Sequence, residues 1–261
     1  MTEVGTEAGA TASASRRFVD RYARWAGLVA GALVAHWLIP LDHGDGILYA
    51  IPAFGLCAVA GVLVGDALTP PARSAVRTAG LDPRRVRDYV PPRMIWLLIA
   101  MAVVLVVLLG VAAAVASPDD LGRAGRSLTV TCRGRTQSFS PWPGLHYGLP
   151  MLACLAVATG ACGWSLRRIA TRPGDEQSRR DRSLAIVAAW GLVVSFSLFG
   201  ATTVASDTLT NTGCGGALSV VADRVLRPLS LVTFVTVPLM LFTVCAPRAT
   251  WRRRGERRVR R

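Results

Sequence analysis

The feature that most constrains this chain is the stretch from Met94 to Ala116, which contains no charged residue and no proline. A helix rises about 1.5 Å per residue, so a stretch of this length crosses a hydrocarbon core of roughly 30 Å. Arg93 precedes it and the polar segment 117–120 follows it, so both ends would meet water or lipid headgroups. A helix also satisfies its backbone amides internally, as lipid requires. The stretch is therefore predicted to be a membrane span.

Five further apolar runs approach the length of about 20 residues that a spanning helix needs. The sequence therefore predicts an all-α, polytopic membrane domain over residues 22–246, with six transmembrane helices at 22–41, 47–65, 94–116, 147–166, 184–205 and 228–246. Residues 1–21 are mostly small and polar and are expected to be disordered, because they offer little to bury. Residues 247–261 form a basic tail.

The arginines indicate an orientation. Arginine supplies every basic residue, and the net charge is +14 although 52% of the residues are hydrophobic. Most arginines fall in the N-terminal segment, in the connections before 94 and after 166, and in the tail. Connections rich in arginine stay in the cytoplasm, so both termini are predicted to be cytoplasmic and the chain to lie in the plasma membrane. A face of this charge is also expected to attract anionic lipid headgroups.

One of these basic connections, residues 69–92, has two interpretations. Prolines bracket a segment in which arginines alternate with valines and a leucine. It is either a solvated basic loop that obeys the orientation rule or a site for a protein partner. The tail is expected to contact anionic lipid and not nucleic acid, because the chain shows no aromatic platform and no known nucleic-acid-binding module.

The connection between 116 and 147 predicts a small extracellular cap. Its SLTVTC and TQSFS segments favour strands and flank a turn that contains glycine, which is typical of a β-hairpin. Cys132 lies in this cap and Cys214 in the last outer connection, and an oxidising exterior favours a disulfide between them, with two free thiols as the alternative. The other four cysteines fall within spans and are expected to pack as small apolar residues.

Two patterns within the spans predict helix packing. Gly27 and Gly31 share a helix face, as do Gly61 and Gly65, and this spacing lets two helices approach closely. In the last span a polar stripe consists of Ser230, Thr233, Thr236 and Thr243. Such a stripe either makes hydrogen bonds between helices or lines a pore, and the first is the commoner role.

No pattern in the sequence predicts catalysis. The span centres carry no ionisable residue, and motifs of serine hydrolases, zinc proteases and nucleotide-binding proteins are absent. The three histidines, His36, His43 and His146, do not have the spacing of a known metal site. We therefore expect no catalytic residues, no metal and no cofactor.

The segments RRVRDYVPPR, at 84–93, and PWPGLHYGLP, at 141–150, precede the third and fourth predicted spans. In this arrangement the chain resembles uncharacterised actinobacterial integral membrane proteins, a resemblance that implies no activity. Our main hypothesis is a non-enzymatic membrane protein with a structural or partner-binding role. The alternative is a permease, or an accessory subunit of a transporter that a separate ATPase energises.

Overall fold

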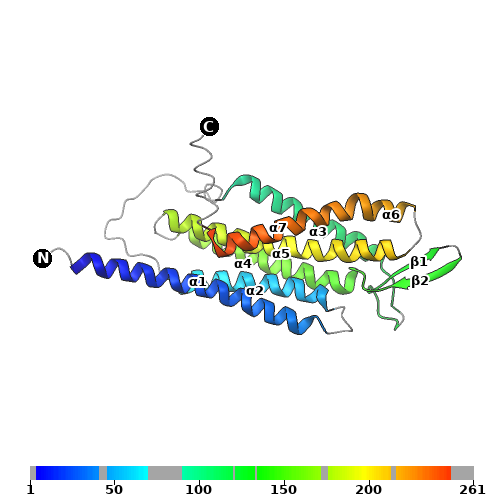
Figure 1. The fold of residues 1–261 in the computed structure, drawn as a ribbon, viewed down its shortest axis with the longest axis horizontal. Coiled ribbons are helices and arrows are strands. Elements are labelled where there is room, and N and C mark those ends of the chain that lie inside the picture. The colour runs from blue at the N-terminus through cyan, green and yellow to red at the C-terminus, as the bar shows by residue number, and fades with distance from the viewer. Residues whose placement is uncertain are drawn as a thin grey trace.

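The computed structural model describes residues 4–40, 46–69, 90–119, 121–132, 134–171, 176–212 and 216–247. The fold is a bundle of long helices with a two-stranded hairpin at one end (Figure 1). In chain order its elements are α1 (Val4–Leu38), α2 (Ile47–Leu68), α3 (Pro92–Ala114), β1 (Leu128–Cys132), β2 (Arg135–Phe139), α4 (Leu145–Thr171), α5 (Glu176–Asn211), α6 (Ala217–Val221), the π-helix η3 (Ala222–Leu226) and α7 (Arg227–Cys245).

Five helical stretches of the described chain are long and apolar enough to cross a membrane: α2, α3, α4, α5 and the continuous run from α6 through η3 to α7. The prediction of an all-α multi-pass membrane protein is therefore supported. The helix α1 is not among the five, because Arg21, Arg24 and His36 lower the hydropathy of its apolar part. The sixth span at 22–41, and with it the placement of both termini, stays a prediction.

The N-terminal segment differs from the sequence prediction. Residues 1–21 were expected to be disordered, whereas α1 already begins at Val4. Alanine, glutamate and serine in this segment are compatible with helix, so the apolar part of α1 can extend it towards the N-terminus. The basic tail, residues 248–261, lies outside the described residues, as do 41–45 and 70–89, which hold His43 and most of the segment 69–92.

The helix α5 is the centre of the bundle, and it packs against α2, α3, α4 and α7 (Figure 1). In its most apolar window, 83% of the residues are buried. Small residues permit this packing: a Cβ on Gly191 would lie 2.9 Å from Sδ of Met240 in α7 and 3.0 Å from Cδ1 of Leu98 in α3. Neighbouring helices therefore approach α5 from several sides.

The glycines of α1 and α2 lie where these two helices touch. A Cβ on Gly27 would lie 2.6 Å from Cα of Gly61, and one on Gly31 would lie 3.0 Å from the carbonyl oxygen of Phe54. Gly65 faces the start of the same contact, where an added Cβ would be 3.0 Å from Oδ1 of Asp20. The two backbones are so close that a side chain at Gly27 or Gly61 would force them apart.

The polar stripe of α7 turns towards α5. Thr233, Thr236 and Thr243 are buried, and each hydroxyl donates to a carbonyl of its own helix at 2.7–3.0 Å. Ser230 makes the one bond of the stripe that crosses between described helices, because its hydroxyl donates to Oγ1 of Thr202 in α5 at 2.9 Å. Three of the four hydroxyls are therefore satisfied within α7 itself.

The hairpin matches the sequence prediction. Its strands are antiparallel, with Leu128 opposite Phe139 and Cys132 opposite Arg135, so the turn consists of residues 133–134. Gly134 has a φ of +78°, which favours glycine. Residues 217–226 are not a separate surface element, because α6 and η3 extend α7 along its own axis.

Candidate functional site

The most elaborate polar structure in the described chain is at the end of the bundle that carries the hairpin, which we call the cap end (Figure 1). The cap consists of residues 117–144, less the undescribed 120 and 133. Beneath it lies a small apolar core of its own, formed by Ala112, Leu128, Trp142, Ala205, Leu209, Ala222 and Leu226. This core joins α3, α5 and η3 to the hairpin.

A tight loop connects α3 to the hairpin. Ser117 and Ser127 form an antiparallel bridge, with N to O distances of 2.7 and 3.2 Å. The hydroxyl of Ser127 also donates to the carbonyl of Pro118 at 2.6 Å. Gly122 and Gly125, with φ of +76° and +75°, let the chain reverse between the two serines. The sequence therefore closes this loop with hydrogen bonds before the first strand begins.

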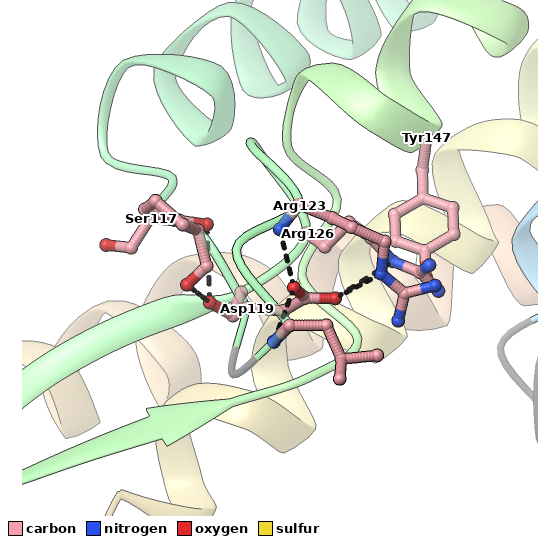
Figure 2. A network of polar contacts seen from close by, with 8 residues as sticks. Ser117, Asp119, Arg123, Arg126 and Tyr147 are labelled. Carbon is pink, nitrogen blue, oxygen red and sulfur yellow. Dashed lines mark hydrogen bonds and ion pairs between the residues drawn. The ribbon is translucent and has the colours of Figure 1, made fainter.

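Asp119 organises the inside of the loop (Figure 2). Its carboxylate accepts from the backbone N of Leu121 at 3.1 Å and of Arg123 at 2.8 Å, and from Nε of Arg123 at 2.7 Å. Nε of Arg126 is 3.9 Å away. Partial desolvation raises the pKa of Asp119, but these donors and the charge of Arg123 outweigh it, so the pKa is lower than that of a free aspartate. The carboxylate therefore serves as a structural anion.

Arg126 anchors the loop to α4 (Figure 2). Only 2% of this residue is exposed, and its NH2 group donates to the hydroxyl of Tyr147, itself fully buried, at 2.8 Å. The guanidinium also lies over the Tyr147 ring, 5.5 Å from its centroid, in a cation–π contact. An arginine that serves only solubility would point into water. Arg126 instead contributes to the fixed position of the cap.

Trp142 and Thr208 attach the cap to two more helices. The indole Nε1 of Trp142 donates to the carbonyl of Ala112 in the last turn of α3 at 2.9 Å. The hydroxyl of Thr208 in α5 donates to the carbonyl of Pro141 at 3.2 Å. Trp142 is 5% exposed, so its ring packs inside the cap.

An aromatic group lies next to Arg126. The rings of Tyr49, His146 and Tyr147 contact one another, with centroids 4.9–6.0 Å apart. Tyr147 is buried and His146 is exposed, so the imidazole reaches the surface. The arrangement links α2 to α4 beneath the cap. The ring contacts therefore hold the ends of α2 and α4 together beneath the cap.

The cysteines divide as follows. Cys57, Cys154, Cys162 and Cys245 have free thiols and lie in α2, α4 and α7. Cys132 is not among the free cysteines, whereas Cys214 lies outside the described residues. The predicted bond between Cys132 and Cys214 therefore stays a prediction.

The opposite end, which we call the basic end, contains ion pairs that the sequence analysis missed. Arg24 of α1 is 6% exposed, forms an ion pair with Asp20, and donates from NH1 to the carbonyl of Val244 in α7 at 3.2 Å. Arg182 of α5 pairs with Asp66 of α2 at 3.0 Å. Asp20 and Arg24 are four positions apart on one helix, a spacing that could have indicated their pair. Asp66 and Arg182 are 116 positions apart, so no sequence pattern connects them.

Within the described residues, no group of three or more histidine, cysteine or acidic side chains could hold a metal ion. The chain matches no protein-family model, no curated protein and no solved structure. The structure supports a membrane protein of many helices, while the resemblance to an actinobacterial group has no support from these comparisons. What the cap end offers is a polar surface that hydrogen bonds attach to a bundle of helices long and apolar enough to cross a membrane.

Proposed function

We propose that this chain is a non-enzymatic plasma-membrane protein that holds its cap rigidly outside the membrane for a protein partner. The observation that carries the proposal is Arg126, which belongs to a surface loop and yet is 2% exposed and bound to a buried tyrosine. Burying an arginine is costly unless it is paired and hydrogen-bonded. A loop that only connected α3 to α4 would not need this anchor.

The hairpin gives the cap a distinctive surface. Thr129, Thr131, Thr136 and Ser138 occupy one face of the two strands, and all four are exposed. We call them the hydroxyl face. The opposite face carries Leu128, Val130 and Phe139, and of these Leu128 and Val130 contact the apolar core of the cap. The hydroxyls of Thr131 and Thr136 lie 3.0 Å apart and bond to each other. A surface of uncharged donors and acceptors suits a partner that binds through hydrogen bonds.

The predicted disulfide would complete the anchoring. Cys132 is the last residue of β1, next to the turn, and Cys214 belongs to the connection between α5 and α6. A bond between them would tie the tip of the hairpin to the central helix. Such a bond restricts the unfolded chain and keeps the hydroxyl face at a fixed height above the bundle.

The test is purification of the tagged protein from its native membrane in a mild detergent, with co-purifying chains identified by mass spectrometry. We expect a stoichiometric partner that is lost when Thr129→Arg places a bulky charge on the hydroxyl face. Leu121→Arg is the matched control, because Leu121 is 76% exposed in the cap but lies outside the hydroxyl face. It should keep the partner, and both variants should unfold at the wild-type temperature.

Three outcomes would contradict the proposal. The wild type could purify alone, or both variants could keep the partner. A stoichiometric ATPase that survives Thr129→Arg would instead favour the alternative of a transporter subunit.

A further inference from the structure

Arg179, in the first turns of α5, is buried without a partner. It is 7% exposed, and its Nε is inaccessible to water and has no hydrogen-bond partner. Within the part of the chain that the structure describes, Arg179 forms no ion pair, hydrogen bond or ring contact. Burying this Nε is unfavourable, because the N–H has left water without gaining an acceptor in exchange.

Contacts between α4 and α5 place this residue. Nε1 of Trp190 donates to Oγ1 of Thr159 at 2.9 Å, and Sγ of Cys162 lies 3.9 Å from the carbonyl of Ile186. The two helices run antiparallel, so this register continued by two turns puts Arg179 beside the buried Ile169 of α4. Arg179 therefore lies between the basic ends of α4 and α5.

The length of α5 sets the depth of Arg179. A helix of 36 residues spans about 54 Å, whereas the hydrocarbon core is roughly 30 Å thick. About two turns of α5 therefore extend beyond the core at each end if the helix is centred. Arg179 is the fourth residue of α5, so it lies at the level of the lipid phosphates or just beyond.

Two nearby carboxylates whose side chains the structure describes do not pair with Arg179. Asp66 binds Arg182 at 3.0 Å. Asp181 accepts from Nε2 of Gln177 at 3.1 Å and projects about 200° around α5 from Arg179. Arginines at 167, 168 and 180 belong to the same end of the bundle. Among the described side chains, no carboxylate is therefore paired with Arg179, and an anion from outside the chain could take that place.

We propose that Arg179 is the centre of a binding site for a phosphate group between α4 and α5. A guanidinium binds phosphate oxygens through two parallel N–H donors, and such bonds are among the strongest that side chains make. The source of the phosphate is the headgroup of an anionic lipid or a free phosphate ion. The arginine-rich sequence predicts a general attraction of anionic lipid to one face, and this proposal locates one phosphate site at Arg179. This site is independent of the cap and its partner.

The test compares thermal unfolding of the delipidated protein in maltoside micelles with three additions: phosphatidylglycerol, inorganic phosphate, and sodium chloride of equal ionic strength. For the wild type we expect a rise of several degrees with one or both phosphate sources and none with the chloride. Arg179→Met should lose this response. Arg93→Met is the matched control, because it removes one exposed positive charge at the same end, and it should respond as the wild type does.

A second readout separates a ligand site from ordinary packing. Without added anion, Arg179→Met should unfold at a higher temperature than the wild type, because it removes an unpaired buried charge. Arg179→Lys keeps the charge but loses the planar fork, so its apparent affinity for the phosphate source should be about ten-fold weaker. If Arg179→Met does not fold, Arg179→Lys alone tests the proposal through this loss of affinity.

The additions identify the source. A response to phosphatidylglycerol alone assigns the site to a lipid, and a response to inorganic phosphate as well assigns it to phosphate in general. The proposal is overturned if Arg179→Met and the wild type respond equally to every addition. It is also overturned if Arg179→Met is the less stable of the two without anion while Arg179→Lys matches the wild type in every titration.

Discussion

The helices α3 and α5 both have the length and composition of membrane spans, yet they occupy opposite positions. In its most apolar window α3 is the most hydrophobic span of the described chain, and only 22% of that window is buried. The corresponding window of α5 is less hydrophobic and 83% buried. Val103, Val107 and Val111 of α3 are each more than half exposed and face away from the bundle.

The difference shows which property of a helix places it at the centre of a bundle in lipid. Lipid tails are as apolar as leucine, so hydrophobicity does not draw a helix inwards. A helix takes a central position when its backbone can approach those of its neighbours closely. In α5, Gly191 and Gly200 lie where neighbouring helices pack against it. Its buried hydroxyls are mostly satisfied locally: Ser195 donates to the carbonyl of Gly191 at 2.7 Å, and Thr202 to that of Leu198 at 2.8 Å.

The largest expected effect comes from adding a side chain to a glycine of each helix. Gly191→Val should destabilise the protein by about 3 kcal/mol, because its first new carbon would meet α3 and α7 at 2.9–3.0 Å. Gly110→Val in α3 should change stability little, since no atom lies within 4 Å of an added Cβ. Unfolding in a denaturing detergent titration measures both. Equal losses would break the comparison.

Truncating a leucine in each helix should give the next largest difference. Leu198 of α5 is 0% exposed, so Leu198→Ala should leave a cavity and cost about 2 kcal/mol. Leu97 of α3 is 46% exposed, and lipid can fill the space that Leu97→Ala leaves. The same titration should show a loss of less than about 0.5 kcal/mol there.

A smaller effect of opposite sign is expected at Ser197. Its hydroxyl is buried and has no hydrogen-bond partner within the described residues, so Ser197→Ala should stabilise the protein by about 1 kcal/mol. Ser195→Ala removes a satisfied hydroxyl from the same helix and should be neutral or slightly destabilising. If Ser197→Ala were the more harmful of the two, the hydroxyl would have a role within α5.

The smallest effect concerns pH and should be confined to the cap. The pKa of Asp119 is lowered in the folded protein, so its contribution to stability is present above the pKa of an unfolded aspartate, about 3.9, and is lost as the pH falls through the folded value. The protection of the hairpin amides against hydrogen exchange, relative to an unfolded chain at the same pH, should therefore decrease below about pH 4. The centres of α3 and α5 carry no ionisable residue and should not respond. In Asp119→Asn the acid effect should disappear.

The sequence predicted those parts of the fold that depend on local chemistry. The spans at 47–65 and 94–116 and the hairpin follow from hydropathy and alternation, which act over a few residues. The central position of α5 depends on contacts with four other helices, and its glycines and alanines are informative only once a partner is known. Similarly, Arg126 and Tyr147 are 21 positions apart, so no periodic pattern connects them.

The π-helix η3 has a consequence for how one continuous rod serves two cores. Leu218, Ala222 and Leu226 recur at intervals of four and contact the cap, whereas Thr233, Thr236 and Met240 further along are buried in the bundle. A π-helical turn holds about one residue more than an α-turn, so η3 takes up an extra residue between these two sets. Deleting one residue of η3 would therefore let this turn close as an α-turn with both sets still facing their cores. The same deletion within α7, before Thr233, would instead turn one set by about 100° relative to the other.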